Sequence, residues 1–556
     1  YRYFDTYGGS VLYPFGYGLG YGKAELSSVS VGLDGCDVTV SVEVENTGET
    51  YPVQEVVQVY CSRPDSGKTG AAWFLDTFQK TQVLAPGESQ TLHLRFPVLA
   101  LFHKSALAYV LEEGYYDIRV GTGSRATCLA GSIRLTRSAV VQAVTPCEFP
   151  DAELAARKEP MHLFTYPEEA EERETAHRRA IRLSDRNLPR RSRKKGRPFT
   201  GCRGDNERYT LADVKEGRCS AFTFIAGMDD ANLRKLVCDF GFCPTDVPGA
   251  LGASAELPRY GLSPLTIASG VCGLALKKDI EQDDGTYRHQ YTTGFPAPSV
   301  LSCSFDPDLI FSVGKAIGRE MREYGVSFCL APGCALQRTP FDAVSQESWS
   351  EDPVLTGRCA LYFAKGVQTY GAAILRAGTL PRSLDMRLSS FRDIYGLPFE
   401  IAVSAYKAVL LPDSTVNGES LGEGGLYLHG APYFMAPSEQ IRVPMVMWLS
   451  KDWSRTSRRW RSGSTPSAGW RSTWAEGWSS GASIRCCSPT ASERKSCSAG
   501  RSASATACGM RPKNSCSASR TSASTAMSPG TSTAAASAGG SSPTGRCCKP
   551  PRDWPP

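Results

Sequence analysis

The chain has 556 residues and a formal net charge of +6, with 41% hydrophobic and 21% charged residues. This length is enough for about three or four domains of roughly 150 residues, and the composition excludes a wholly disordered chain. No stretch contains the roughly 20 consecutive apolar residues that a membrane-spanning helix needs. The sequence therefore predicts a soluble protein.

The charge is divided unevenly along the chain. Residues 454–556 carry a net charge of +12, which leaves −6 for residues 1–453. The same tail contains 25 Ser and 7 of the 20 Cys, but one Ile and no Leu, Val, Phe or Tyr. Because such a segment has too few apolar side chains to build a core, we predict a disordered, low-complexity basic tail.

The cysteine pattern and the amino-terminal sequence bear on the compartment. The cysteines before the tail stand mostly alone, without the paired spacing of a zinc site or the density of a small disulfide scaffold. This usage favours a reducing compartment. The chain opens at Tyr1 without a Met or a signal-peptide pattern, so a signal peptide is either absent or lost with a missing amino terminus. We expect a cytoplasmic chain.

Residues 25–138 run in short segments in which apolar and polar side chains alternate. Clear examples are residues 38–45 and 91–96, and turn-forming strings such as Asn-Thr-Gly at 46–48 separate the segments. Period-two alternation with regularly spaced turns is typical of a β-sandwich. No His, Asp or Glu cluster accompanies these segments, so the pattern favours a structural or accessory module.

Residues 139–206 form a polar connector with an acidic run at 168–174 and a basic run at 190–197. A basic octamer can bind nucleic acid or act as a nuclear address. Because no aromatic residues are interleaved with it and no binding fold surrounds it, a solvated charged linker is the favoured interpretation. We predict neither a specific nucleic-acid partner nor a membrane partner.

Helical and strand-like segments alternate after residue 207. Residues 306–324 and 352–370 show the apolar spacing of helices, and residues 326–330 have the composition of a short buried strand. Such alternation predicts an α/β architecture with parallel strands, whose chemistry normally lies at the carboxyl ends of the strands.

Two groups of motifs resemble glycoside hydrolase family 3. The string Leu-Tyr-Pro-Phe-Gly-Tyr-Gly-Leu at residues 12–19 resembles the end of the family's α/β sandwich domain, and the segment after it resembles the family's fibronectin type III-like domain. Further strings, including Thr-Gly-Phe-Pro at 293–296, Leu-Ala-Pro-Gly at 330–333 and Ser-Glu-Asp-Pro at 350–353, resemble the family's (β/α)8 barrel and follow its order.

The resemblance implies a multidomain fold. Residues 1–24 would be the end of the α/β sandwich domain, and a fibronectin type III-like β-sandwich at residues 25–138 would be followed, after the linker, by an incomplete (β/α)8 barrel at residues 207–411. The sandwich precedes the barrel, which resembles the rearranged branch of the family that includes bacterial β-glucosidases.

The resemblance also implies an activity and site residues. Family members of this kind hydrolyse O-glycosyl bonds of β-glucosides or oligosaccharides with retention, using a carboxylate nucleophile and a carboxylic acid. Arg338, Glu351 and Asp352 match substrate-binding positions, although barrels commonly use such residues in structural ion pairs. Asp452 is the candidate nucleophile, with a surface Asp as the alternative. The acid/base residue and the oligomeric state cannot be assigned.

Several family motifs are altered. The Asp of an Asp-Gly-Pro motif corresponds to Ser269, which replaces a charge-assisted hydrogen bond by a neutral one. A Gly-Arg-Asn motif corresponds to Ala-Val-Ser at 343–345, and a Lys-His pair corresponds to residues 373–378, where Arg376 is the remaining cation. We therefore expect a weakly active or inactive chain, with a non-catalytic carbohydrate-binding remnant as the alternative.

Residues 412–453 resemble a different family. The string Gly-Glu-Ser at 418–420 and the residues after it are similar to the zinc-dependent catalytic domain of lipid A phosphoethanolamine transferases. The Asp-His pair that binds zinc there corresponds to Val416 and Asn417, and His429 alone cannot hold the ion. We expect no metal and no cofactor, and a transferase is the less favoured function. The junction with the tail suggests a chimeric or frame-shifted sequence.

Overall fold

The computed structural model describes most of the chain up to residue 420. The described residues are 1–64, 71–98, 100–103, 105–143, 166–188, 209–238, 243–339, 341, 345–376, 383–384, 387–402, 405–406, 408–410, 415–416 and 419–420. Asp452, His429 and the predicted tail at residues 454–556 lie outside them. The disorder predicted for the tail therefore remains a prediction.

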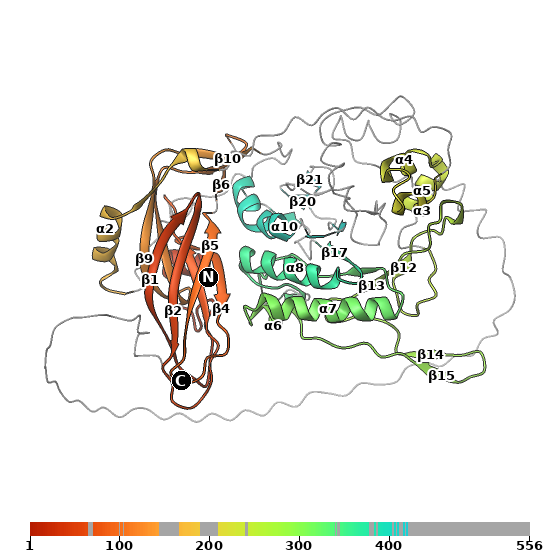
Figure 1. The fold of residues 1–556 in the computed structure, drawn as a ribbon, viewed down its shortest axis with the longest axis horizontal. Helices are drawn as coiled ribbons and strands as arrows, with labels where there is room; N and C mark the ends of the chain where they lie inside the picture. The colour runs from red at the N-terminus through yellow and green to blue at the C-terminus, as the bar shows by residue number, and fades with distance from the viewer. Residues whose placement is uncertain are drawn as a thin grey trace, which may run out of the picture. The chain divides into compact units, whose positions relative to one another are not determined.

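The amino-terminal part is a β-sandwich preceded by helix α1 (Arg2–Tyr7) (Figure 1). One antiparallel sheet has the order β1-β2-β5, and a second has the order β11-β9-β8-β3-β4. The bounds of these strands are β1 (Ala24–Asp34), β2 (Asp37–Asn46), β3 (Val56–Cys61), β4 (Phe74–Lys80), β5 (Ser89–Pro97), β8 (Gly114–Gly123), β9 (Ala126–Leu135) and β11 (Ile181–Leu183). A smaller sheet contains β6 (Leu101–His103), β7 (Ala108–Leu111) and β10 (Ala139–Ala143).

The alternation in the sequence sets which faces of the strands are buried. Val38, Val40, Val42 and Val44 alternate along β2 and are at most 1% exposed. Successive side chains of a strand point to opposite faces, so these valines all face the second sheet. The strand predicted over residues 38–45 is thus observed as β2.

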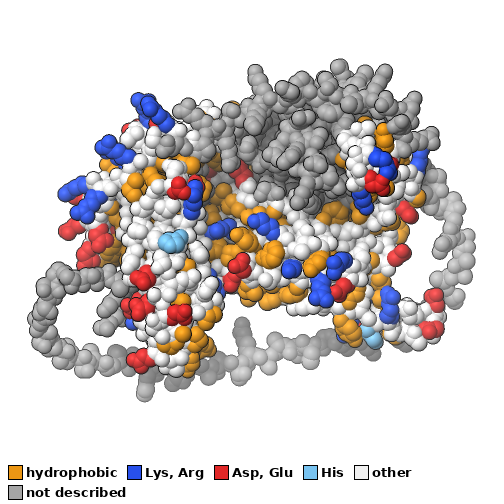
Figure 2. Space-filling model, viewed as in Figure 1, with side chains coloured by type: hydrophobic (Ala, Val, Ile, Leu, Met, Phe, Trp, Pro, Cys, Tyr) orange, Lys and Arg blue, Asp and Glu red, His pale blue; other side chains and the backbone are white. Residues whose placement is uncertain are grey.

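Residues 166–188, which the sequence analysis placed in the charged linker, are packed onto the sandwich. Helix α2 (Glu169–Arg178) leads into β11, which pairs in parallel with β9. Glu169 forms an ion pair with Arg119 of β8, and both side chains are at least 96% buried. Asp117 of the same strand accepts a 2.7 Å hydrogen bond from Arg173 Nε, and its carboxylate lies 2.8 Å from His177 Nε2. The acidic run therefore belongs to a helix held by buried ion pairs, and Figure 2 shows charged side chains of both signs over it.

The second part is an α/β region built on a five-stranded sheet of order β12-β13-β16-β17-β19. Strands β13, β16, β17 and β19 pair in parallel, and β12 is antiparallel to β13. The bounds are β12 (Gly252–Ala253), β13 (Thr266–Ser269), β16 (Phe328–Leu330), β17 (Ala372–Arg376) and β19 (Ala408–Leu410). This sheet confirms the predicted α/β alternation with parallel strands.

Helices α7 (Pro307–Glu323) and α8 (Pro353–Val367) connect these strands and agree with the two helices predicted from sequence. Asp306 and Asp352 are their N-caps, and a proline occupies the first position of each helix. An Asp side chain satisfies amide groups of the first turn, and proline fits there because it has no N–H to satisfy. These local rules explain why both helices begin where the sequence indicates.

The remaining elements are short. The helices are η1 (Asp185–Asn187), α3 (Leu211–Lys215), α4 (Ala221–Ala226), α5 (Asp230–Cys238), η2 (Pro258–Tyr260), α6 (Pro298–Ser302), η3 (Ser345–Glu347), α9 (Leu388–Ser390), the π-helical η4 (Phe391–Gly396) and α10 (Leu397–Ala402). The strands are β14 (Asp279–Glu281), β15 (Tyr287–His289), β18 (Ser383–Leu384), β20 (Thr415–Val416) and β21 (Glu419–Ser420).

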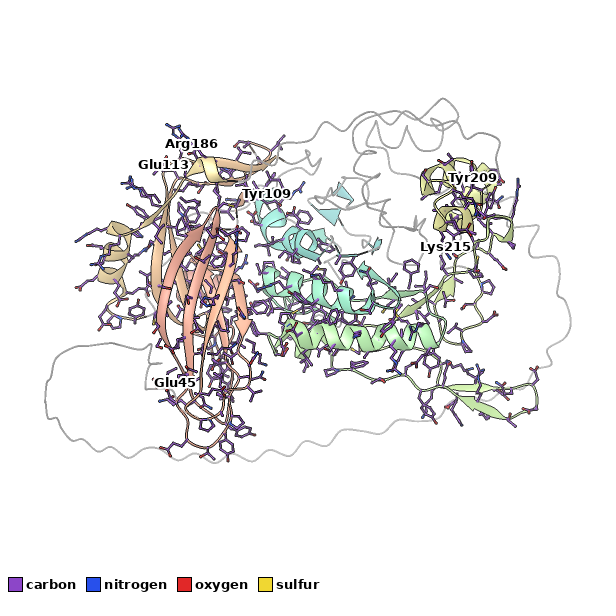
Figure 3. The ribbon with its side chains drawn as sticks, viewed as in Figure 1. Glu45, Tyr109, Glu113, Arg186, Tyr209 and Lys215 are labelled. Atoms are coloured by element: carbon purple, nitrogen blue, oxygen red, sulfur yellow. The ribbon has the colours of Figure 1, made fainter. Side chains whose placement is uncertain are left out.

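One hydrophobic cluster joins the sandwich to the α/β region. It includes Tyr60 and Leu75 of the sandwich together with Ile317 and Phe363 of α7 and α8. Arg358 of α8 donates a hydrogen bond of 2.9 Å to Thr77 Oγ1 of β4. Tyr109 of β7, labelled in Figure 3, donates a 2.8 Å hydrogen bond to Glu400 of α10.

Two structural observations relate to the predicted compartment. No helix in the described part of the chain is long and apolar enough to cross a membrane. Cys128 is disulfide-bonded. Disulfides persist mainly in oxidising compartments, whereas the cysteine spacing in the sequence favours a reducing one. The cytoplasmic location stays a prediction.

Candidate active site

The carboxyl ends of the parallel strands are the place where an α/β sheet of this kind normally carries its chemistry. Strands β13 and β16 end at Ser269 and Leu330, which lie side by side in the register. Gly270 follows at once, and a Cβ atom added to it would lie 2.3 Å from Cys329 Sγ. The edge is therefore tightly packed, and its side chains at these two strand ends are uncharged.

Arg338 lies on the segment that follows β16. Its side chain is exposed, and its Cζ atom lies 5.5 Å from the ring centroid of Tyr395 in η4. Burial raises the pKa of Tyr395, and the charge of Arg338 partly offsets this rise. Arg338 is thus an exposed cation beside a buried aromatic ring. Its role in binding sugar remains a prediction.

Asp352 is fully buried at the start of α8. Its Oδ1 atom accepts hydrogen bonds of 2.8 and 2.9 Å from the backbone N–H groups of Val354 and Leu355. Its Oδ2 atom accepts one of 2.9 Å from the Tyr1 hydroxyl and one of 3.2 Å from Arg2 Nη2. These bonds satisfy both oxygens, an arrangement typical of a structural ion pair and helix cap.

Glu351 takes a different partner from its neighbour. Its Oε2 atom lies 2.7 Å from the backbone nitrogen of Tyr1, and its side chain is 46% exposed. Glu351 and Asp352 are therefore both joined to the residues before the sandwich, whereas Arg338 contacts Tyr395. The structure brings the two carboxylates together at α1, and the sugar-binding role inferred for them stays a prediction.

Two carboxylates near this region were not predicted from sequence: Asp76 of β4, which is buried, and Asp393 of η4, which is half-buried. Burial raises the pKa of each of them to about 7. One signal for Asp76 is present in the sequence, since it stands among apolar residues of a strand. Asp393 gives no such signal, because the residues around it do not show how far its side chain is shielded.

A groove of about 380 Å³ lies on the outer face of β1, β2 and β5, away from the strand ends described above. Ser30, Thr39, Ser41, His93 and Arg95 contribute polar groups to it. Arg95 is engaged by Asp37, 2.8 Å from its Nε atom, and also by Asp34. The groove therefore presents mainly hydroxyl groups and one imidazole.

Metal chemistry has no support within the described residues, where no group of three or more His, Cys, Asp or Glu side chains could hold a metal ion. Val416, which stands at the position of a zinc ligand in the transferases, belongs to the short strand β20. Asn417 and His429 lie outside the described residues. The expected absence of a metal stays a prediction.

Comparison with protein families matches each of the two parts of the chain to a known domain family. Residues 55–124 match the fibronectin type III-like domain, and residues 266–378 match the glycosyl hydrolase family 3 N-terminal domain. The chain carries domains of glycoside hydrolase family 3. The sandwich precedes the family 3 domain, as the motifs predict. Residues 417–467 match the sulfatase family, which overlaps the segment predicted at 412–453 to resemble a different enzyme.

Individual family 3 proteins extend this similarity over most of the chain. It is 31% identical to a β-glucosidase of Ruminococcus albus, covering 75% of this chain and 44% of that protein. It is 29% identical to β-glucosidase A of Butyrivibrio fibrisolvens, covering 77% and 56%. A solved β-glucosidase from Paenibacillus barengoltzii superposes with a TM-score of 0.60 at 27% identity, covering 76% and 47%. The chain thus spans about half the length of these relatives.

Proposed function

We propose that this chain is a β-glucosidase-like retaining hydrolase of family 3 that hydrolyses β-glucosides weakly or not at all. The relatives named as β-glucosidases support the substrate class. The observation that carries the loss of activity is the pairing of Asp352, whose two oxygens are satisfied by a helix terminus, Tyr1 and Arg2. Asp352 is therefore engaged within the protein and is not available to bind a sugar hydroxyl, which is the role that the family resemblance implies for it.

The roles proposed for Asp452 and Arg338 follow from the charges of their side chains. Asp452 would attack the anomeric carbon, and Arg338, as an exposed cation, would donate hydrogen bonds to sugar hydroxyls. Ser269 at the end of β13 offers only a neutral hydroxyl at the position where the family resemblance implies a carboxylate. Each lost charged contact of this kind reduces the rate by about 10²–10³-fold, so the missing contacts together are expected to abolish measurable turnover.

The test is incubation of the full chain with 4-nitrophenyl β-glucoside at neutral pH. We expect nitrophenol release at the rate of the buffer alone. An Asp452→Asn chain, prepared in parallel, should give the same trace, because an inactive chain has no turnover for the substitution to remove. Release by the unmodified chain that disappears in Asp452→Asn would contradict the proposal and identify the nucleophile.

A second candidate function, carbohydrate binding without cleavage, is favoured by an aromatic surface after α1. Residues 6–22 contain no charged residue, and Tyr13, Tyr17 and Tyr21 are 62%, 51% and 93% exposed. The rings of Tyr13 and Tyr17 lie 5.2 Å apart, and Tyr21 lies 6.0 Å from Tyr51. The negative faces of such rings attract C–H groups of a sugar, and exposed patches of this kind mark interaction sites.

Affinity electrophoresis in gels that contain a soluble β-glucan tests this second function. We expect the chain to migrate more slowly than in a gel without glucan, and the Tyr13→Ala/Tyr17→Ala double variant to lose at least half of this retardation. Tyr287→Ala is the matched control, because Tyr287 is 58% exposed on β15, outside this surface. Unretarded migration of the unmodified chain would eliminate the binding function.

A further inference from the structure

Charged side chains are concentrated in the buried junction between α1, the sandwich and the α/β region. The junction cluster consists of Arg2, Arg63, Asp76, Asp352 and Asp393. Arg2 and Arg63 both lie against the ring of Phe74, with Cζ atoms 4.5 and 3.8 Å from its centroid. The side chains of Arg63, Asp76 and Asp352 are at most 5% exposed, and that of Arg2 is 14% exposed.

The three carboxylates differ in the number of hydrogen bonds that they accept from the protein. Asp352 accepts hydrogen bonds from four donors, and Asp393 accepts one of 3.0 Å from the Phe102 backbone N–H. Among the described residues, no N–H or O–H group donates a hydrogen bond to Asp76. The Cys61 thiol, a weak donor, faces it, and Arg63 Nη2 lies 3.8 Å from its Oδ1 atom. An ionised carboxylate that is buried without hydrogen bonds is costly, whereas a protonated one is much less so.

The balance of charges in the junction cluster also favours a protonated carboxyl group. Two guanidinium groups face three carboxyl groups, so full ionisation would leave an uncompensated negative charge in a region that excludes water. One proton makes the cluster neutral. We propose that the junction cluster holds one proton, mainly on Asp76, and that loss of this proton as the pH rises weakens the contact between the sandwich and the α/β region.

The groups around each carboxylate support this assignment. Burial raises the pKa of Asp76 to about 7, and Asp352 adds to the rise. Arg63, Arg2 and the Cys61 thiol oppose it. Cys61, which also faces Asp76, stays neutral because burial raises its pKa well above the usual range.

Asp393 titrates in the same range for similar reasons. Burial raises its pKa to about 7, against the Phe102 N–H and the charges of Arg63 and Arg2, while Glu400 adds to the rise. Glu400 itself accepts a hydrogen bond from Tyr109 and faces Arg392. Burial raises the pKa of Glu400, and Tyr109 and Arg392 only partly offset the rise.

The sign of the pH dependence follows from linkage. An Asp in the unfolded chain has a pKa of about 3.9, so between roughly pH 4 and pH 7 the folded chain binds more protons than the unfolded chain. The stabilisation is complete below the unfolded pKa and is lost as the pH rises through the folded value.

The experiment measures the midpoint of thermal unfolding of the full chain from pH 5.5 to 8.5. We expect the midpoint of the unmodified chain to fall across this range. The midpoint of Asp76→Asn should be at least about 4 °C higher than that of the unmodified chain at pH 8, because the amide is neutral at every pH. Asp283→Asn, an exposed position in the β14–β15 turn, is the control and should follow the unmodified chain.

Hydrogen exchange of the unmodified chain provides a second measurement that needs no variant. After correction for the intrinsic rate, peptides that cover β4 and η4 should exchange several-fold faster at pH 8 than at pH 6, and peptides from the centre of β2 should not. Equal corrected exchange at the two pH values would overturn the proposal. So would an Asp76→Asn profile parallel to that of the unmodified chain.

Discussion

Replacing Asp352 with Ala is expected to lower the free energy of unfolding by about 3–5 kcal/mol. The side chain is fully buried, and it accepts hydrogen bonds from the first turn of α8, from Tyr1 and from Arg2. Its removal leaves Arg2, which is 14% exposed, without the carboxylate that it contacts at 3.2 Å. Urea unfolding of both chains, with the slope compared as well as the midpoint, measures the loss.

Asp306→Ala is the matched control, because Asp306 caps α7 in the same way. Its Oδ1 atom accepts hydrogen bonds of 3.1 and 3.0 Å from the N–H groups of Asp308 and Leu309, and no buried Arg contacts it. Loss of a cap alone costs about 1 kcal/mol. Equal losses in the two variants would show that the ion pair with Arg2 contributes nothing.

Asp352→Asn separates the structural role of Asp352 from the predicted role in binding sugar. Asn is also a good N-cap, so this variant keeps the acceptor for Val354 and Leu355 and loses the charge beside Arg2. If Asp352 acts only in the structure, the variant is less stable and its affinity for β-glucan is unchanged. Weaker sugar binding at unchanged stability would favour the role inferred from the family resemblance.

The elements that could be predicted from sequence are those fixed by neighbouring residues. The alternating valines of β2 and the Asp-Pro starts of α7 and α8 each act within a few residues, and all three elements lie where they were expected. Helix α2 and strand β11 could not be found in this way. Their positions depend on Arg119 and Asp117, about 50 residues earlier. Arg119 forms a buried ion pair with Glu169, and Asp117 contacts the partly exposed side chains of Arg173 and His177.

The candidate site shows the same limit. Sequence could place Ser269 through its resemblance to a family motif and Asp352 at the start of a predicted helix, because both depend on nearby residues. It could not show that Tyr1 and Arg2 satisfy Asp352 from 350 residues away. Nor could it show that Asp76 is buried, since burial of one strand position is decided by the layers that cover it.

Helices α7 and α8 contact each other through glycines, and replacing Gly366 with Val is expected to cost about 3 kcal/mol or more. A Cβ atom at Gly366 would lie 2.2 Å from the carbonyl oxygen of Phe311 and 2.7 Å from the nitrogen of Lys315, and both atoms belong to the backbone of α7. A backbone cannot rotate away as a side chain can, so the helices must separate. Ile317 and Val367, which are fully buried nearby, would then lose contacts.

The same urea titration measures this loss, and Gly294→Val is its control. Gly294 is exposed, its φ angle is not in the left-handed region, and no atom lies within 4 Å of a Cβ placed there. Its substitution is expected to change stability by no more than about 0.5 kcal/mol. A comparable loss in both variants would mean that the effect does not come from the close approach of α7.

The variant Gly366→Ala shows whether a change in stability at this position comes from helix propensity or from contact with α7. Ala is a better helix former than Gly by about 1 kcal/mol, so on local grounds alone this variant should be more stable than the unmodified chain. The contact with the carbonyl oxygen of Phe311 acts in the opposite direction. A net loss of stability in Gly366→Ala can therefore arise only from contact with α7, because the intrinsic propensity of the helix has the other sign.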